Sequence, residues 1–233
     1  MSFFGRTLGR INKKNKKRIL VKRKKTFSVF PAKYLNIGGH EFVKKHWHNL
    51  DHRTEHYPIL KELIDFDVDL SLQNKWDFSK DSFYELAYCA FVIDQLDDAA
   101  SKVIFSEAFR VLKKGGVFRV AVPDLDLFKK HYSLGNKELF FIGRVPELYS
   151  LPLDDLFLYV TNANELVGKY PQLKYLPHIS AWDFKKVERF MEEAGFVNVK
   201  KCACRQSDII EFCKNTEHGS HVGLYVEGVK NNE

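Results

Sequence analysis

The sequence lacks a long hydrophobic run. It has no stretch of about 18 uninterrupted apolar residues, the length that a transmembrane helix needs, and its first residues lack the apolar segment of a signal peptide. It also has few cysteines, four in 233 residues, without the even spacing of a disulfide framework. We therefore expect a protein of the cytoplasm, where thiols stay reduced.

The cysteines do not predict a metal site either. Cys202, Cys204, Cys213 and His218 could be drawn as zinc ligands. However, an expected strand at 197–204 places Cys202 and Cys204 on one face, where a free cysteine acts as a small hydrophobic residue. We expect no bound metal.

Acidic side chains are absent from residues 1–30, which carry 11 Lys or Arg and which we call the arm. The other 203 residues hold 26 basic and 30 acidic side chains, so the overall charge of +7 belongs to the arm. A solvated arm is one interpretation. Another is that residues 1–25, which include Phe3, Phe4 and Leu8, bind an anionic membrane surface from the cytoplasmic side. Nucleic-acid binding is less favoured, because the arm has few aromatics and the rest of the chain is acidic.

Residues 31–233 read as a single α/β domain. The chain is 45% hydrophobic, enough to bury a core, and strand-like and helix-like segments alternate. This order predicts a mostly parallel sheet with helices on both faces. Beyond two short strands that end near Gly38 and at Asp51, we expect strands at 65–70, 84–92, 117–122, 197–204 and 221–229, a helical turn at 57–63, and helices at 99–112 and 184–194.

Local signals mark the ends of the helices. The run Lys113–Gly116 predicts that a left-handed glycine ends the first helix. Ser180–Asp183 resembles a capping box at the start of the second, and Gly195 stops it. Periodicity breaks down between 125 and 176, where prolines recur, so this span is expected to be a lid or a small helical insert.

The first two strands carry the pattern of a nucleotide site. Adjacent glycines, Gly38 and Gly39, let the backbone turn sharply and approach a ligand closely, while Asp51 at the end of the next strand can hold a ribose diol. Two glycines after an apolar run are also common in ordinary turns, so this pattern is weak when taken alone.

A series of segments resembles, in order, the motifs of one enzyme family. They are Leu35–His40 at the glycine turn, Asn49–Asp51, Asp69–Leu70, the loop Trp76–Phe83, Ala108–Gly116, Val120–Leu125, His178 with Trp182–Phe184, Ala194–Phe196 and Leu224–Gly228. Over residues 33–230 the chain resembles a class I S-adenosylmethionine-dependent methyltransferase, of the small branch often found beside glycan-assembly genes.

The resemblance implies a Rossmann-like sheet of seven strands whose last strand is antiparallel. It also implies S-adenosylmethionine as the cofactor. The turn formed by Asn36, Gly38, Gly39 and His40 would pass the methionine end, and Asp51 would accept the ribose hydroxyls.

The other expected cofactor contacts are Asp69 and Leu70 at the adenine, and Phe91 after the fourth strand. Two features depart from the family pattern: His40 replaces its third glycine, and the segment 91–96 lacks its two histidines. Retention of the fold with loss of activity is therefore a second interpretation.

His178 is the first candidate for a general base, because imidazole titrates near neutral pH and the residue follows the irregular span 125–176. A structural histidine that bonds the start of the next helix is equally compatible with the sequence. Asp124, at the carboxyl end of a central strand, is a second candidate or a turn residue. Asp94 is a third, or a helix N-cap.

The family resemblance implies methyl transfer with a sugar or surface-glycan precursor as the acceptor, and a candidate general base suits a hydroxyl of such an acceptor. Two alternatives stay open at this point. One is an RNA methyltransferase that holds phosphates with the arm, and the other is an inactive binding or scaffold protein that keeps the fold.

Overall fold

The computed structural model describes residues 32–39, 44–52, 64–72, 75–140, 146–171, 178–214 and 221–231. The arm, His40, His218 and the helical turn expected at 57–63 lie outside these residues, so the expectations for them stay predictions. Within the described ranges, no helix is both long and apolar enough to cross a membrane.

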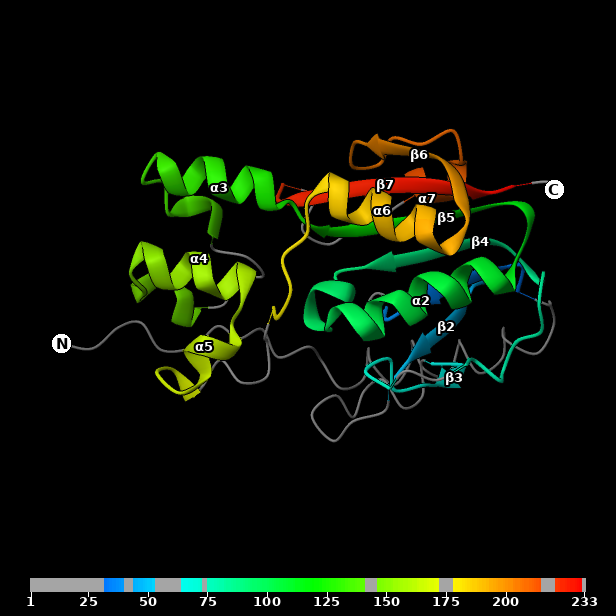
Figure 1. Cartoon of the computed structure of the whole chain (residues 1–233), viewed down its shortest axis with the longest axis horizontal. Coiled ribbons are helices and arrows are strands. Elements are labelled where there is room, and N and C mark those ends of the chain that lie inside the picture. The colour runs from blue at the N-terminus through cyan, green and yellow to red at the C-terminus, as the bar shows by residue number, and fades with distance from the viewer. Residues whose placement is uncertain are drawn as a thin grey trace, which may run out of the picture.

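Seven strands form one sheet in the order β3-β2-β1-β4-β5-β7-β6 (Figure 1). The strands are β1 Tyr34–Ile37, β2 His48–Asp51, β3 Phe66–Asp67, β4 Tyr84–Ala90, β5 Leu112–Pro123, β6 Phe196–Cys202 and β7 Gly223–Lys230. Neighbours from β3 to β5 are parallel, whereas β7 runs antiparallel to both β5 and β6. The predicted sheet, mostly parallel with an antiparallel last strand, is confirmed.

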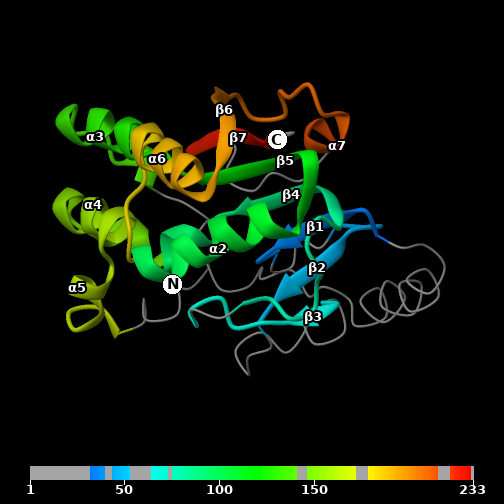
Figure 2. The same cartoon turned by 45° about the vertical axis from the view of Figure 1, so that its right-hand side comes forward.

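Alternation along the strands decides which side chains meet which helices. Leu35, Ile37 and Cys89 point into the main core, which α2 (Asp98–Val111) and α6 (Phe184–Ala194) cover. Tyr88 points to the other face and packs against Phe212 of the short helix α7 (Ile210–Cys213). Helices therefore cover both faces, as Figure 2 shows.

The two long helices begin at aspartates. Asp97 accepts a hydrogen bond from the backbone N–H of Ala100 at the start of α2, and Asp183 accepts one from Lys186 at the start of α6. Gly195 ends α6 with φ +103°, as predicted. The expected capping box is wrong, since Asp183 is itself the N-cap and Ser180 donates its hydroxyl to the Ile93 carbonyl.

Three other expectations need correction. β3 has two residues rather than the predicted 65–70. No glycine ends α2, because Leu112 follows it in extended conformation and begins β5; Gly115, with φ +75°, lies in a bulge of that strand. β6 ends at Cys202, so Cys202 and Cys204 do not share a strand face.

The irregular span is helical. It contains α3 Leu125–Ser133, 3-10 turns at Glu138–Phe140 and Pro146–Ser150, α4 Leu153–Thr161 and α5 Asn164–Val167. We call the described residues of 125–171 the helical insert. Its side chains form a second hydrophobic cluster around Phe128, Phe140 and Tyr159, joined by Phe91 and Val222 from the sheet side. The insert lies beyond the carboxyl end of β4 (Figures 1 and 2).

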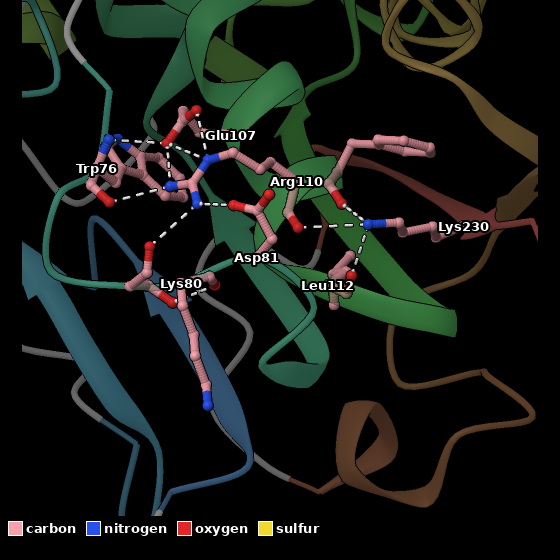
Figure 3. Close-up of polar contacts among 9 residues, drawn as sticks. Trp76, Lys80, Asp81, Glu107, Arg110, Leu112 and Lys230 are labelled. Atoms are coloured by element: carbon pink, nitrogen blue, oxygen red, sulfur yellow. Dashed lines mark hydrogen bonds and ion pairs between the residues drawn. The ribbon is translucent and has the colours of Figure 1, made fainter.

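The amino edge of the sheet is held by Arg110 near the end of α2 (Figure 3). Its guanidinium donates to the Glu107 carboxylate at 2.6 and 2.9 Å and to Asp81 at 2.6 Å. It also donates to the carbonyls of Trp76 and Ser79, both at 3.0 Å, so the loop before β4 is tied to the helix. Bidentate contact of this kind suits the planar fork of arginine.

Lys230 of β7 completes the same edge. Its ammonium donates to the carbonyls of Phe109 at 2.7 Å, Leu112 at 2.8 Å and Arg110 at 3.3 Å. Carbonyls at a helix C-terminus lack partners within the helix, and a cation there is favourable. Burial lowers the pKa of Lys230.

Candidate active site

Ligands of open α/β sheets bind where the strand order reverses, at the carboxyl ends of the strands. Here the reversal falls between β1 and β4, because β2 and β3 extend the sheet to one side and β5 to the other. Leu50, Ile37 and Cys89 stand side by side across β2, β1 and β4. The residues that follow them, Asp51 and Gly38 among them, therefore line this edge together.

The Gly38 turn has the conformation that the sequence predicted. Its φ is +64°, which favours glycine, and its N–H donates to the Leu50 carbonyl at 2.7 Å. A side chain at Gly38 would also clash, since its Cβ would lie 2.3 Å from Cγ2 of Val92. The close approach at this glycine is thus to Val92, a residue that the sequence did not single out.

Two further candidate residues lie at the carboxyl ends of neighbouring strands, Asn36 within β1 and Phe91 directly after β4. Asn36, which is buried, donates from its side-chain amide to Asn49 at 3.1 Å and so joins β1 to β2. Phe91 has φ +55°, which is rare for an aromatic residue, and its ring packs against the helical insert. Strained backbone of this kind gathers at functional sites.

Acidic side chains gather at the ends of β2 and β3. Asp51 and Asp67 are register partners, and Asp51 accepts a hydrogen bond from the N–H of His52 at 2.8 Å. The His52 imidazole lies 3.2 Å from Asp67 and 4.0 Å from Asp69. The side chains of His52, Asp67 and Asp69 are all at least a third exposed, so water and solutes reach this group.

Asp69 and Leu70, the residues expected near adenine, differ in surroundings. Burial raises the pKa of Asp69, but hydrogen bonds from the hydroxyl and N–H of Ser71 outweigh it, and the balance is a lowered pKa. Leu70 is buried in the main core. Asp69 thus carries the polar chemistry of this pair and Leu70 anchors the segment.

Asp94 and His178, 84 positions apart, meet at the end of β4. Nδ1 of His178 lies 2.8 Å from Oδ2 of Asp94. The groups are in contact but are not aligned for a hydrogen bond, and neither Asp94 oxygen accepts one from the described residues. Asp94 is 1% exposed and His178 8%. A buried carboxylate without hydrogen bonds is costly, which marks this pair as a functional candidate.

The segment that carries His178 is fastened to the turn after β4. The N–H groups of Ile179 and Ser180 donate to the Asp94 carbonyl at 2.8 and 3.1 Å. The Trp182 indole donates to the Ile93 carbonyl at 3.3 Å. Both structural interpretations of the pair are wrong: Asp97 rather than Asp94 caps α2, and Asp183 rather than His178 serves the start of α6.

Asp124 has structural contacts of its own. One carboxylate oxygen accepts hydrogen bonds from Asp126 and Leu127, which makes Asp124 the N-cap of α3, and the other lies 3.0 Å from the Lys201 ammonium. The structure therefore brings Asp94 and His178 together, while the hydrogen bonds and ion pair of Asp124 go to α3 and β6.

The thiol of Cys89 lies close enough to Asp94 and Asp51 for both carboxylates to affect its pKa. Burial raises the pKa of its thiol, and the carboxylates of Asp94 and Asp51 raise it further. The thiol stays neutral, and both carboxylates act on the same position of β4. Among the described residues, no three His, Cys, Asp or Glu side chains gather as metal ligands would.

Sequence reasoning missed Val92 and Tyr159. Val92 lies inside a segment that was compared with family histidines, and an apolar side chain there carries no chemical signal. The Tyr159 ring contacts the His178 imidazole with centroids 5.2 Å apart. Tyr159 falls in the span without periodicity, so no signal in the sequence pointed to it.

Comparison with known proteins gives likeness at the level of the fold. No family model and no curated protein sequence matches the chain. A Thermotoga maritima structure, described as an S-adenosylmethionine-dependent methyltransferase and possible histamine N-methyltransferase, is 16% identical with a TM-score of 0.49. The match covers 91% of this chain and 89% of that one.

Two further solved structures are similar. A methyltransferase from Archaeoglobus fulgidus is 11% identical, with a TM-score of 0.47 and coverage of 92% and 94%. The apo methyltransferase SibL is 14% identical, with a TM-score of 0.47; the match covers 94% of this chain but 55% of SibL. Because the identities are this low and the TM-scores lie below 0.5, the function is argued from the site itself.

Proposed function

We propose that the protein is an S-adenosylmethionine-dependent methyltransferase. The observation that carries the proposal is the strand register, which sets the left-handed turn at Gly38 and the carboxylate of Asp51 in one row at the reversal of strand order. A carboxylate has two acceptor oxygens and so suits the vicinal hydroxyls of a ribose. The turn at Gly38 and the carboxylate of Asp51 therefore fit an adenosyl cofactor.

In this proposal different residues of the carboxyl edge contact different parts of the cofactor. The backbone of Gly38 and Gly39, followed by His40, borders the methionine part, and Asn36 and Phe91 are the other residues proposed to contact it. Asp51 holds the ribose, and Asp69 and Leu70 border the adenine. When bound, the cofactor supplies a methyl group attached to a sulfonium.

His178 is the proposed base. Methyl transfer is an in-line displacement, so the protein mainly holds the acceptor oxygen in place and excludes water. The Asp94 carboxylate next to Nδ1 favours a proton on that nitrogen and leaves Nε2 to take the proton of an acceptor hydroxyl. Hydrogen bonds that are poorly aligned in a free enzyme commonly tighten once substrate is bound. Asp124 is assigned to the acceptor side as a weaker candidate.

The proposed acceptor is a hydroxyl of a sugar or surface-glycan precursor, in keeping with the sequence resemblance. The helical insert lies beyond the same edge and would cover the acceptor (Figure 1). The arm is proposed to bind an anionic membrane surface, which would place the enzyme near such precursors. Removing residues 1–25 should abolish sedimentation with anionic liposomes. Equal sedimentation of the truncated protein, or tighter binding to RNA than to liposomes, would contradict this.

One observation favours a second candidate. The Val92 side chain fills the space next to Gly38 that a ligand would otherwise approach. A non-catalytic binding protein that keeps the methyltransferase fold has the same packing and needs no cofactor.

Calorimetry with S-adenosylmethionine separates the two. We expect wild type to bind and Asp51→Ala to bind at least tenfold more weakly, since hydrogen bonds to a charged acceptor contribute about 1.5 to 3 kcal/mol. Asp208→Ala, which removes an exposed aspartate paired with Lys200, is the matched control and should bind as wild type does. No binding by wild type at millimolar cofactor would leave the scaffold function, and equal binding by Asp51→Ala would place the ribose elsewhere.

A further inference from the structure

His178 lies where two hydrophobic cores meet. Trp182, four residues later, belongs to the main core beneath the sheet, where Phe105 stacks on it and Phe190 meets it edge-to-face. Tyr159 of α4 belongs to the separate core of the helical insert and is 2% exposed. The imidazole touches residues of both sides and belongs to neither cluster.

The backbone around His178 is divided in the same way. Its carbonyl accepts a hydrogen bond of 2.6 Å from the N–H of Ala163, between α4 and α5 of the insert. The next two N–H groups, of Ile179 and Ser180, donate to Asp94 on the sheet side. The residue therefore bridges the insert and the turn after β4.

The imidazole ring is also held from two sides. Asp94 lies at its Nδ1, 2.8 Å away, and the Tyr159 ring stands against it at an interplanar angle of 64°. Because the carboxylate and Nδ1 are not aligned for a hydrogen bond, Asp94 alone does not fix rotation of the ring about its bond to Cβ. The Tyr159 ring, which contacts the imidazole in a tilted, edge-type arrangement, restricts that rotation.

We propose that Tyr159 is a positioning residue for His178, so that the helical insert supplies part of the acid–base centre. The inference rests on the proposed function, in which His178 is the base. Tyr159 sets the ring angle, Asp94 sets which nitrogen carries the proton, and together they aim Nε2. Displacement of the insert then turns the imidazole away from its working orientation.

The role follows from where the two holding groups are anchored. Asp94 follows Ile93, which is fully buried in the main core, whereas Tyr159 is buried in the core of the insert. Phe91 and Val222 reach from the sheet into the insert core and keep the two parts in contact. A base oriented from both sides works only while the insert is docked, which couples coverage of the acceptor to readiness of the base.

Nuclear magnetic resonance of the imidazoles tests this without an acceptor. Long-range ¹H–¹⁵N spectra show which ring nitrogen carries the proton, and His178→Gln assigns the His178 signals. In wild type we expect proton contacts between the His178 and Tyr159 rings and a pattern with the proton on Nδ1. In Tyr159→Leu the chemical-shift change that the Tyr159 ring current causes at His178 should vanish, and the nitrogen pattern should become that of a mixture of tautomers. Tyr159→Phe should keep both the ring-current shift and the wild-type nitrogen pattern.

Tyr132→Leu is the matched control, because Tyr132 also lies in the insert but is 37% exposed and contacts Phe157 and Asp154. Absence of the ring contact in wild type, or unchanged His178 signals in folded Tyr159→Leu, would overturn the inference. If Tyr159→Leu does not fold, Tyr159→Met takes its place, and the wild-type contact decides independently of any variant.

Cofactor calorimetry on the same samples separates this inference from the proposed function. Binding of S-adenosylmethionine by wild type and by Tyr159→Leu, with the imidazole pattern changed in the variant, supports a role on the acceptor side. Binding with an unchanged imidazole pattern overturns the inference alone. Loss of binding in wild type overturns both.

Discussion

The amino and carboxyl edges of the sheet differ in how completely their charged groups are hydrogen-bonded. At the amino edge, the Arg110 guanidinium contacts two carboxylates and two carbonyls, and Lys230 contacts three carbonyls (Figure 3). At the carboxyl edge, Asp94 is buried, and none of the described residues donates a hydrogen bond to its carboxylate. One edge satisfies its polar groups and the other leaves some of them unsatisfied.

The difference separates stability from chemistry on one scaffold. Polar groups that are fully hydrogen-bonded fix the shape of the sheet, and removal of one partner leaves the remaining groups without a hydrogen bond. A buried carboxylate kept without hydrogen bonds costs free energy and is retained where it serves a purpose. Substitutions at the amino edge should therefore affect folding, and substitutions at the carboxyl edge should affect activity.

The largest effect is expected from Arg110→Met. The variant leaves the Glu107 carboxylate, 11% exposed, without its cation and frees the carbonyls of Trp76 and Ser79. Breaking such a pair from one side costs about 3 kcal/mol of the free energy of unfolding. Denaturant titration at neutral pH measures it. Arg189→Met, which loses an exposed ion pair with Glu193 and a contact of the guanidinium with the Phe190 ring, should change stability by less than about 0.5 kcal/mol, and an equal effect of both variants would remove the distinction.

His178→Ala should show the reverse pattern. We expect at least about 100-fold slower methyl transfer, because a positioned base contributes that much, and little change in cofactor affinity. Transfer of labelled methyl from S-adenosylmethionine to an extract of cell-surface glycan measures the rate, with exposed His221→Ala as the control. A rate within about threefold of wild type would make His178 structural, and the carboxyl edge would then lose its proposed base.

The smallest effect is expected at Asp81. The Arg110 hydrogen bond holds the pKa of Asp81 below its usual 3.8. A carboxylate with a lowered pKa stabilises the fold above its usual pKa, and that contribution disappears as pH falls through the lowered value. The melting temperature of wild type should therefore exceed that of Asp81→Asn at neutral pH, and the two should converge well below pH 3.8. A difference that stays constant with pH would show that the charge of Asp81 plays no part.

The sequence predicts the sheet because its evidence is local and repeated. Continuous apolar runs in β4 and β5 and apolar spacing in α2 are local signals, and the left-handed end at Gly195 needs only its own neighbours. The failures are local competitions. Asp183, three residues after Ser180, is the N-cap of α6 in place of the expected capping box. The strand β5 begins at Leu112, so α2 ends there and not at the expected glycine.

The site is predictable only where residue type and position along a strand suffice. Gly38 directly follows β1 and Asp51 is the last residue of β2, so parallel pairing brings them together. The contact of Asp94 with His178 depends on how the segment after the insert returns to the turn after β4, which no local pattern encodes. Tyr159 depends in addition on how the insert folds on itself.

The antiparallel strand β7 imposes an order on synthesis. Among the described strands, β6 pairs only with β7, yet it leaves the ribosome first, so β6 has no partner among them until residues 223–230 follow. Lys230 is the last residue of β7, and until it emerges its ammonium cannot reach the carbonyls of Phe109 and Leu112. A growing chain can pair β1 with β4 and β4 with β5 early, but the half of the sheet beyond β5 closes only when its middle strand arrives between two that were already made.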